Sequence, residues 1–189
     1  MRFYGATRCD VGKAMNEDAF ACLDEWAILL DGAGDAKGAA KGCVDLLVAR
    51  LETSPSVAMR ELIGIANQFL LDANEESTVL ALHVQGSALL TAASCGDSPL
   101  YLVREGRVEQ MNEITKPRLG TLQPGVKYLA FPLRRSDVII GATDGLCLAS
   151  YRLLNAVQRT MLWPDSMPEA ILQAQRDSFD DVTLVCAVI

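Results

Sequence analysis

The order of apolar runs along the chain is the feature that most constrains its fold. Three short strands are expected first, over Arg2–Arg8, Asp18–Leu23 and Trp26–Leu30. Two helices follow, then several hairpin strands, then two more helices and a final strand. Because the helices are grouped between runs of hairpins, and do not alternate with single strands, this order favours antiparallel sheets over a doubly wound parallel sheet.

Helices are predicted where apolar residues recur at three and four residue steps, and strands where short apolar runs flank turn residues. The expected helices cover Ala36–Leu51, Val57–Leu71, Tyr151–Leu162 and Pro168–Arg176, with Ser54 or Ser56 as the cap of the second. The expected later strands cover Ser77–Val84, Ser87–Ser94, Leu100–Val103, Val108–Met111, Asp137–Ala142 and Val182–Ile189. The runs at Asp137–Ala142 and Val182–Ile189 are continuously apolar, which indicates strands covered on both faces. The sequence therefore predicts an α+β fold in which two antiparallel sheets pack together with helices outside.

Length and charge narrow the class of protein further. The 189 residues suit a single domain over 1–189, and half of them are apolar. A formal net charge of −7 argues against a nucleic-acid partner, because phosphate contacts need clustered Lys and Arg. No apolar window is long enough for a membrane span, and Met1–Ala6 lacks the apolar core of a signal peptide. A cytoplasmic location is therefore expected.

Acidic residues stand where several of the apolar strands begin or end. Glu17 precedes one strand, Asp31 and Asp144 each follow a strand and precede a glycine, and Asp180 precedes the last strand. Gathered at one sheet edge, these carboxylates would repel one another unless a cation held them. One histidine and no C-x-x-C pair argue against zinc, whereas all-oxygen ligands favour Mg²⁺ or Mn²⁺. The simpler alternative is that each Asp only ends a strand or forms a turn.

A set of short motifs carries a resemblance that spans nearly the whole chain. The sequence resembles the metal-dependent protein phosphatases of type 2C, and its small size and Asp-Asp-x-Thr ending resemble their bacterial stress-response and sporulation branch. The family fold is a sandwich of two antiparallel sheets flanked by helices, in four layers, which agrees with the order of elements above. The motifs are Asn16-Glu17-Asp18-Ala19-Phe20, Asp31-Gly32-Ala33-Gly34, Ser77-Thr78, Cys95-Gly96-Asp97-Ser98, Ala142-Thr143-Asp144-Gly145-Leu146 and Asp180-Asp181-Val182-Thr183.

The resemblance implies a centre of two Mn²⁺ or Mg²⁺ ions. Asp31 is then expected to bridge both ions, and Asp144 and Asp180 to complete the coordination of one. Glu17 and the backbone carbonyl of Gly32 are expected at the other ion. Two such ions activate a water for in-line attack on a phosphoryl group. The implied activity is hydrolysis of phosphoserine or phosphothreonine in proteins.

Further residues take supporting roles by the same resemblance. Asp97 is expected to help Asp144 hold a third, weaker ion. Asp18 and Asp181 are expected to support the centre without binding an ion. Lys13 stands where the family usually has a phosphate-binding arginine, and a lysine offers a point charge without the bidentate fork.

Several departures leave a second function open. Asp35 replaces the second glycine of the Asp-Gly tag, and the flap of many bacterial members is shortened to about Asn112–Gly125. With Lys13, these changes keep open a catalytically silent family member that acts as a partner-binding module. Position 33 is alanine, so no histidine acid is expected there, and His83 lies mid-strand as a packing or surface residue. The expected partner is a phosphorylated bacterial signalling protein: a Ser/Thr kinase, one of its targets, or a phosphorylated regulator.

Overall fold

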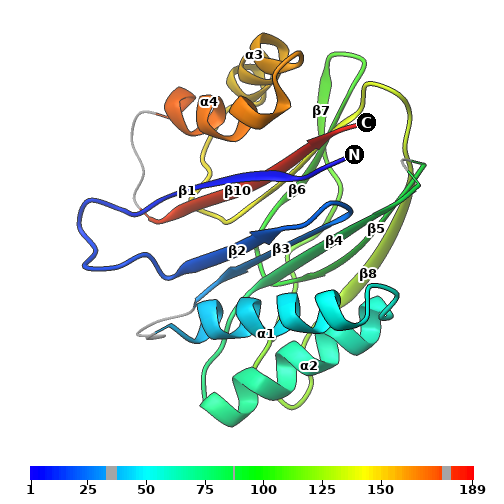
Figure 1. The fold of residues 1–189 in the computed structure, drawn as a ribbon. Coiled ribbons are helices and arrows are strands. Elements are labelled where there is room, and N and C mark those ends of the chain that lie inside the picture. Colours follow the sequence, from blue (N-terminus) through cyan, green and yellow to red (C-terminus); the bar gives the residue numbers. More distant parts are fainter. Residues whose placement is uncertain (33–37, 87, 176–179) are drawn as a thin grey trace.

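Two five-stranded antiparallel sheets form the centre of the molecule (Figure 1). The computed structural model describes residues 1–32, 38–86, 88–175 and 180–189. In spatial order, the first sheet contains β1 (Tyr4–Arg8), β10 (Val182–Val188), β9 (Val138–Ala142), β6 (Leu100–Arg104) and β7 (Arg107–Gln110). The second sheet contains β2 (Asp18–Cys22), β3 (Trp26–Asp31), β4 (Val79–Gln85), β5 (Leu89–Cys95) and β8 (Lys127–Pro132).

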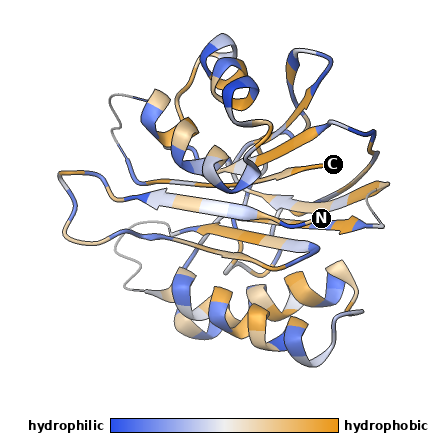
Figure 2. Cartoon of the chain, turned by 45° about the horizontal axis from the view of Figure 1, so that its top comes forward, coloured by the Kyte–Doolittle hydropathy of each residue, from blue (hydrophilic) through white to orange (hydrophobic). Residues whose placement is uncertain are grey.

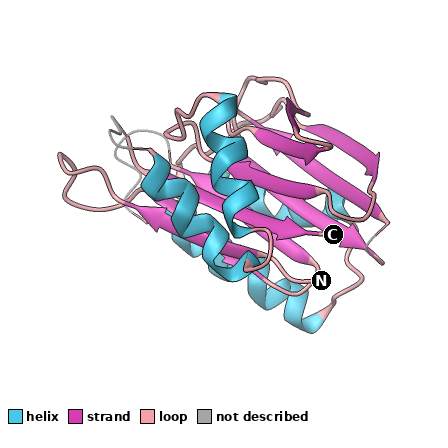
Figure 3. Cartoon of the chain, turned by 90° about the horizontal axis from the view of Figure 1, so that it is seen from above, coloured by secondary structure: helices cyan, strands magenta, loops and turns pink. Residues whose placement is uncertain are grey.

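Two helices cover the outer face of each sheet. Helices α1 (Ala39–Thr53) and α2 (Met59–Ala73) pack on the second sheet, and α3 (Ser150–Thr160) and α4 (Met167–Ala174) pack on the first. A short 3₁₀ turn, η1 (Pro164–Ser166), leads into α4. In Figure 1 the helices lie above and below the two sheets, so the α+β four-layer prediction is confirmed. Figure 3 looks down on the same layers from above, with helices in front of the strands.

Three buried clusters fill the spaces between the four layers. Along β3, Ile28 packs against α1 and α2, whereas Leu29 faces the other sheet. The inter-sheet cluster joins Leu29 and Leu82 to Ile139 and Val185 of the first sheet. Each central strand is therefore covered on both faces, which explains why β9 and β10 are continuously apolar. The helices carry both hydrophobic and hydrophilic residues in Figure 2, and their hydrophobic residues pack in the clusters against the sheets.

The observed elements differ from the sequence prediction in two places. Strand β8 was not predicted, because it lies at a sheet edge, pairs only with β5 and has mostly exposed side chains. The cap predicted for α2 is wrong: the helix begins after Ala58, without a side-chain cap. Ser54 instead ends α1, where its N–H donates to the carbonyl of Arg50. Ser87 and Arg176, at predicted element ends, lie outside the described residues.

Within the described residues, no helix is long and apolar enough to cross a membrane.

Candidate metal centre

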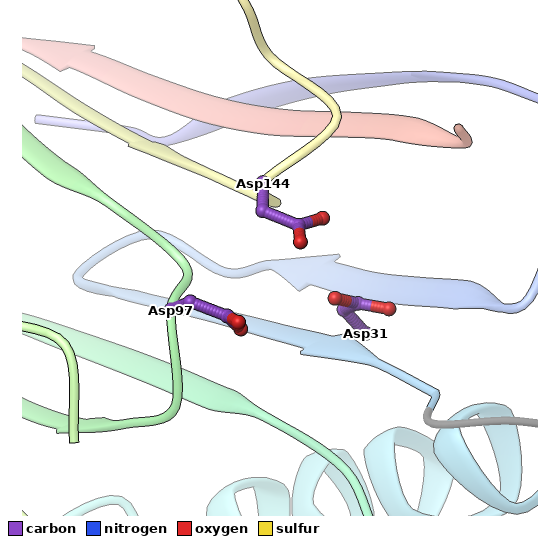
Figure 4. A group of neighbouring side chains, drawn as sticks. All are labelled: Asp31, Asp97 and Asp144. Carbon is purple, nitrogen blue, oxygen red and sulfur yellow. The ribbon is translucent and has the colours of Figure 1, made fainter. Parts of the chain in front are cut away.

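Three carboxylates from distant parts of the chain meet at one end of the sandwich (Figure 4). Asp31 ends β3, Asp97 lies in the connection from β5 to β6, and Asp144 follows β9 by two residues. One oxygen of each side chain lies within 4.8 Å of an oxygen of the other two. Since β3 and β9 belong to different sheets, only the packing of the two sheets brings these groups together.

The backbone of Asp31 is fixed by the two residues that precede β4, the next strand of its sheet. The Ser77 hydroxyl donates to the Asp31 carbonyl at 2.8 Å, and the Thr78 N–H donates to the same oxygen at 3.0 Å. The Asp31 N–H donates to the Thr78 hydroxyl at 3.2 Å. The sequence motif Ser77-Thr78, to which no chemistry was assigned, therefore fixes the backbone that carries the central carboxylate.

Gly145 allows the Asp144 loop to lie directly on the start of β10. A Cβ at this position would lie 1.9 Å from the carbonyl oxygen of Asp181, a distance that no side chain can occupy. A glycine after Asp144 could also serve to let the backbone approach a metal. The structure shows a different reason for it, which is close contact between two backbone segments that each carry an acidic residue of the site.

Burial and neighbouring negative charges disfavour the ionised forms of Asp18, Asp31 and Asp144. Burial, and then the negative charges of Asp18 and Asp144, raise the pKa of Asp31 to about 8. Burial and the charges of Asp97 and Asp180 also raise the pKa of Asp144. Burial raises the pKa of Asp18 to about 6, although the hydroxyl of Thr143 donates to its carboxylate at 2.8 Å. Such a cluster favours any bound cation, and its all-oxygen donors fit Mg²⁺ or Mn²⁺.

A second acidic group surrounds the ammonium of Lys13. Its Nζ donates to Asp180 at 2.5 Å, to Glu17 at 2.8 Å and to Asp181 at 3.3 Å. Burial alone lowers the pKa of Lys13, but the hydrogen bonds to Asp180 and Glu17 outweigh it and raise this pKa above its usual range. The lysine thus neutralises acidic residues at the ends of β2 and β10.

Asp181 ties the loop between β1 and β2 to the start of β10. Its side chain is 1% exposed and accepts the backbone N–H groups of Asp10 and Glu17, both at 2.8 Å. Burial raises the pKa of Asp181, but these backbone N–H donors and Lys13 lower it overall. Its carboxylate is therefore occupied by hydrogen bonds that hold Glu17 and Lys13 in position.

The predicted metal ligands fall into two neighbouring groups. Asp31, Asp97 and Asp144 form one, and Glu17 and Asp180 lie together around Lys13. The backbone links the two groups, because the N–H of Gly32 donates to the carbonyl of Glu17 at 3.3 Å. Ala33 and Asp35, which also entered the sequence argument, lie outside the described residues.

His83 lies outside the site, whereas Arg118 is a site residue that was not predicted. His83 lies away from the carboxylates and stacks on Trp26, with ring centroids 4.0 Å apart, so its predicted packing role is confirmed. Arg118 was missed: its Nη2 lies 3.2 and 3.3 Å from the two carboxylate oxygens of Asp97. No motif marks Arg118 in the loop Asn112–Gly125, so the sequence offered no signal for it.

A family model decides the relationship of this chain to known proteins. The model described as "Stage II sporulation protein E (SpoIIE)" matches residues 26–189, most of the chain. The chain belongs to the SpoIIE family. The sequence resemblance to the sporulation branch of the type 2C phosphatases is thereby confirmed. None of the curated proteins compared with the chain matches it.

Solved structures share the fold of this SpoIIE-family chain over nearly its full length. The catalytic domain of the serine/threonine phosphatase PstP, in complex with two manganese ions, superposes with a TM-score of 0.81 at 19% identity, covering 99% of this chain and 98% of that one. The phosphatase MsPP from Mycobacterium smegmatis gives 0.79 at 20%, covering 97% and 96%. PppA of Pseudomonas aeruginosa gives 0.78 at 19%, covering 100% and 99%.

Proposed function

We propose that this chain is a metal-dependent phosphatase that hydrolyses phosphoserine or phosphothreonine in proteins. The meeting of Asp31, Asp97 and Asp144 at one end of the sandwich carries the proposal. Three carboxylates within 4.8 Å, with the pKa of Asp31 raised to about 8, are an arrangement that a divalent ion stabilises. The fold shared with a manganese-bound serine/threonine phosphatase supports the same reading.

In this proposal the acidic residues hold two divalent ions, Mn²⁺ or Mg²⁺. Asp31 would bind both, Asp144 and Asp180 one of them, and Glu17 with the carbonyl of Gly32 the other. Asp97 would help Asp144 hold a third ion. When bound, the ions supply an activated water for in-line attack and withdraw charge from the phosphoryl group. The chain itself supplies ligands and a fixed geometry, and it supplies no covalent nucleophile.

The residues of the chain also control how the centre is assembled. Ser77 and Thr78 fix the backbone of Asp31, so the position from which its carboxylate projects is set before any ion binds. Lys13 neutralises Glu17 and Asp180, so ions that bind either carboxylate compete with its ammonium. The role of Lys13 as a phosphate ligand stays a prediction, and it requires that the ammonium leave these carboxylates.

The deciding experiment is hydrolysis of p-nitrophenyl phosphate and of a phosphoserine peptide with added Mn²⁺. We expect turnover that a chelator abolishes and that Asp31→Asn reduces by at least about a thousandfold, because that change removes the shared ligand. Asp45→Asn, a change to an exposed helix residue paired with Lys41, is the matched control. Absence of turnover by the parent, with Asp31→Asn indistinguishable from it, would overturn the proposal.

A silent, partner-binding member of the family is the second reading of the sequence. No contact in the described residues favours it over catalysis. Calorimetry separates the two, because tight Mn²⁺ binding without hydrolysis of any phosphoprotein would indicate a binding module. For the enzyme, the proposed substrate is a phosphorylated signalling protein in the bacterial cytoplasm, such as a Ser/Thr kinase, its target or a phosphorylated regulator.

A further inference from the structure

Arg118 places a guanidinium beside the three-carboxylate cluster. Its side chain is 27% exposed, and Nη2 contacts both oxygens of Asp97, at 3.2 and 3.3 Å. Its positive charge is close enough to offset part of the rise in the pKa values of Asp31 and Asp144 that burial and the neighbouring carboxylates cause. Among the described residues, the Nε and Nη1 groups of Arg118 donate to no partner, so part of the fork is available to a ligand.

The loop that carries Arg118 is fastened to the same backbone segment that fixes Asp31. Leu119 is fully buried and exchanges two backbone hydrogen bonds with Ser77, at 3.2 and 3.0 Å. On its other side, Ser77 forms a β-bridge with Gly32. The three segments form a short ladder, Gly32 to Ser77 to Leu119. Arg118 is therefore held in a fixed position relative to the site.

The residues after Arg118 lock the loop from a second direction. Gly120 has φ +89°, and a Cβ there would lie 1.9 Å from the carbonyl oxygen of Glu75. Its N–H donates to the side chain of Asn67 on α2 at 2.8 Å. The hydroxyl of Thr121 donates to the carbonyl of Arg118 itself at 2.9 Å. An arginine on such an anchored loop has a smaller entropic cost of binding than one on a free loop.

Among the described residues, Lys13 and Arg118 are cations beside the acidic groups, and they differ in the number and length of their contacts with carboxylates. Lys13 makes three contacts with carboxylates, the shortest at 2.5 Å. Arg118 uses a single nitrogen on a single carboxylate, at more than 3 Å. A phosphate that approaches the cluster can therefore separate Arg118 from Asp97 at a lower cost in free energy than it can separate Lys13 from its three carboxylates. The planar fork of an arginine also matches two phosphate oxygens, which a lysine cannot do.

We propose that Arg118 binds the phosphoryl group of the substrate, and that this loop residue takes over the role of the arginine that Lys13 replaces. The inference rests on the proposed function and names a further substrate-binding residue for it. Asp97 then has a second task besides any metal: it holds the guanidinium at the edge of the site until phosphate arrives.

The test measures binding of inorganic phosphate to the Mn²⁺-loaded protein by calorimetry, together with KM and kcat for p-nitrophenyl phosphate. For Arg118→Gln we expect the Kd of phosphate and KM each to rise roughly 10- to 100-fold, as loss of a charge-assisted hydrogen-bond pair implies. Arg118→Lys keeps the charge and should lie between the two. Arg107→Gln, on the exposed strand β7, is the matched control and should equal the parent.

Binding of Mn²⁺ to Arg118→Gln, measured by the same calorimetry, separates substrate binding from a structural role. On the proposal this variant binds Mn²⁺ as tightly as the parent and loses only phosphate affinity. Loss of Mn²⁺ affinity that matches the loss of phosphate affinity would mean that Arg118 acts only by positioning Asp97, and would overturn the inference. If the parent hydrolyses phosphate esters and Arg118→Gln has the same phosphate affinity and KM as the parent, the inference about Arg118 is wrong and the proposed function stands. A parent that binds Mn²⁺ but neither phosphate nor ester overturns the proposed function with it.

Discussion

Replacing Asp31 by asparagine should stabilise the metal-free protein, although it removes the central ligand. In the chelated protein, Asp31 is surrounded by other carboxylates, and its pKa is raised from 3.8 to about 8. An acid whose pKa is higher in the folded than in the unfolded state loses stability as pH rises between the two values. The penalty is absent below pH 3.8, grows through the interval and is complete above about pH 8. Asparagine has nearly the same shape and carries no charge, so it escapes this penalty.

The size of the effect follows from the same shift. At pH 7 the unfolded carboxyl is ionised and the folded one is still mostly protonated, so at ~1.4 kcal/mol per pH unit the upper limit is about 4 kcal/mol. Asp31 is only partly buried, and water screens its neighbours' charges, so we expect roughly 1–3 kcal/mol. For a chain of this length, that corresponds to a rise in Tm of roughly 3–9 °C. At pH 5 the difference should shrink to below about 1 kcal/mol.

The assay is thermal and urea unfolding of parent and Asp31→Asn in a chelator, at pH 5 and pH 7, with Asp45→Asn as the exposed control. In Mn²⁺ the order should reverse, because ligand binding to the folded state stabilises the parent and not the variant. A variant that is less stable than the parent at pH 7 without metal would refute the argument that the carboxylates repel one another. A parent whose Tm is the same with Mn²⁺ and with chelator would refute the metal centre itself.

Three other changes test separate parts of the structure. Gly145→Ala should lower Tm in metal and in chelator alike, because its Cβ would strike the Asp181 carbonyl and the two segments must separate; circular dichroism melts would detect this. Lys13→Met should lower the stability of the chelated protein at pH 7 by about 1–3 kcal/mol in urea unfolding, because it leaves the 1% exposed Asp181 side chain without its cation. Leu82→Ala, in the inter-sheet core, should cost about 2–5 kcal/mol in the same assay, whereas Leu162→Ala, 81% exposed, should cost almost nothing.

The sequence was sufficient for the architecture because that information is local. Apolar runs, turn residues and helical periodicity gave the order of strands and helices and thus two antiparallel sheets with outer helices. The edge strand β8 was not predicted, because an exposed strand needs few apolar residues and so lacks the apolar run that marks a buried strand. The cap of α2 was assigned wrongly because a serine between two helices can belong to either end.

The candidate site was predictable only as a set of residue types. The acidic residues at strand ends identified Asp31 and Asp144 as candidates, and the family resemblance added Asp97. Which of them meet depends on how one sheet lies on the other. Lys13 contacts three carboxylates, and Arg118 contacts Asp97. Both sets of contacts depend on loop conformations that no local sequence pattern predicts.

By itself, then, the sequence determined the elements, their layering and the acidic character of the centre, since hydrophobic periodicity and residue chemistry are properties of short segments. The tertiary structure decided which carboxylates share a space and which cation faces them. Those outcomes depend on contacts between residues far apart in the chain, such as the ladder of Gly32, Ser77 and Leu119 that brings Arg118 to the site.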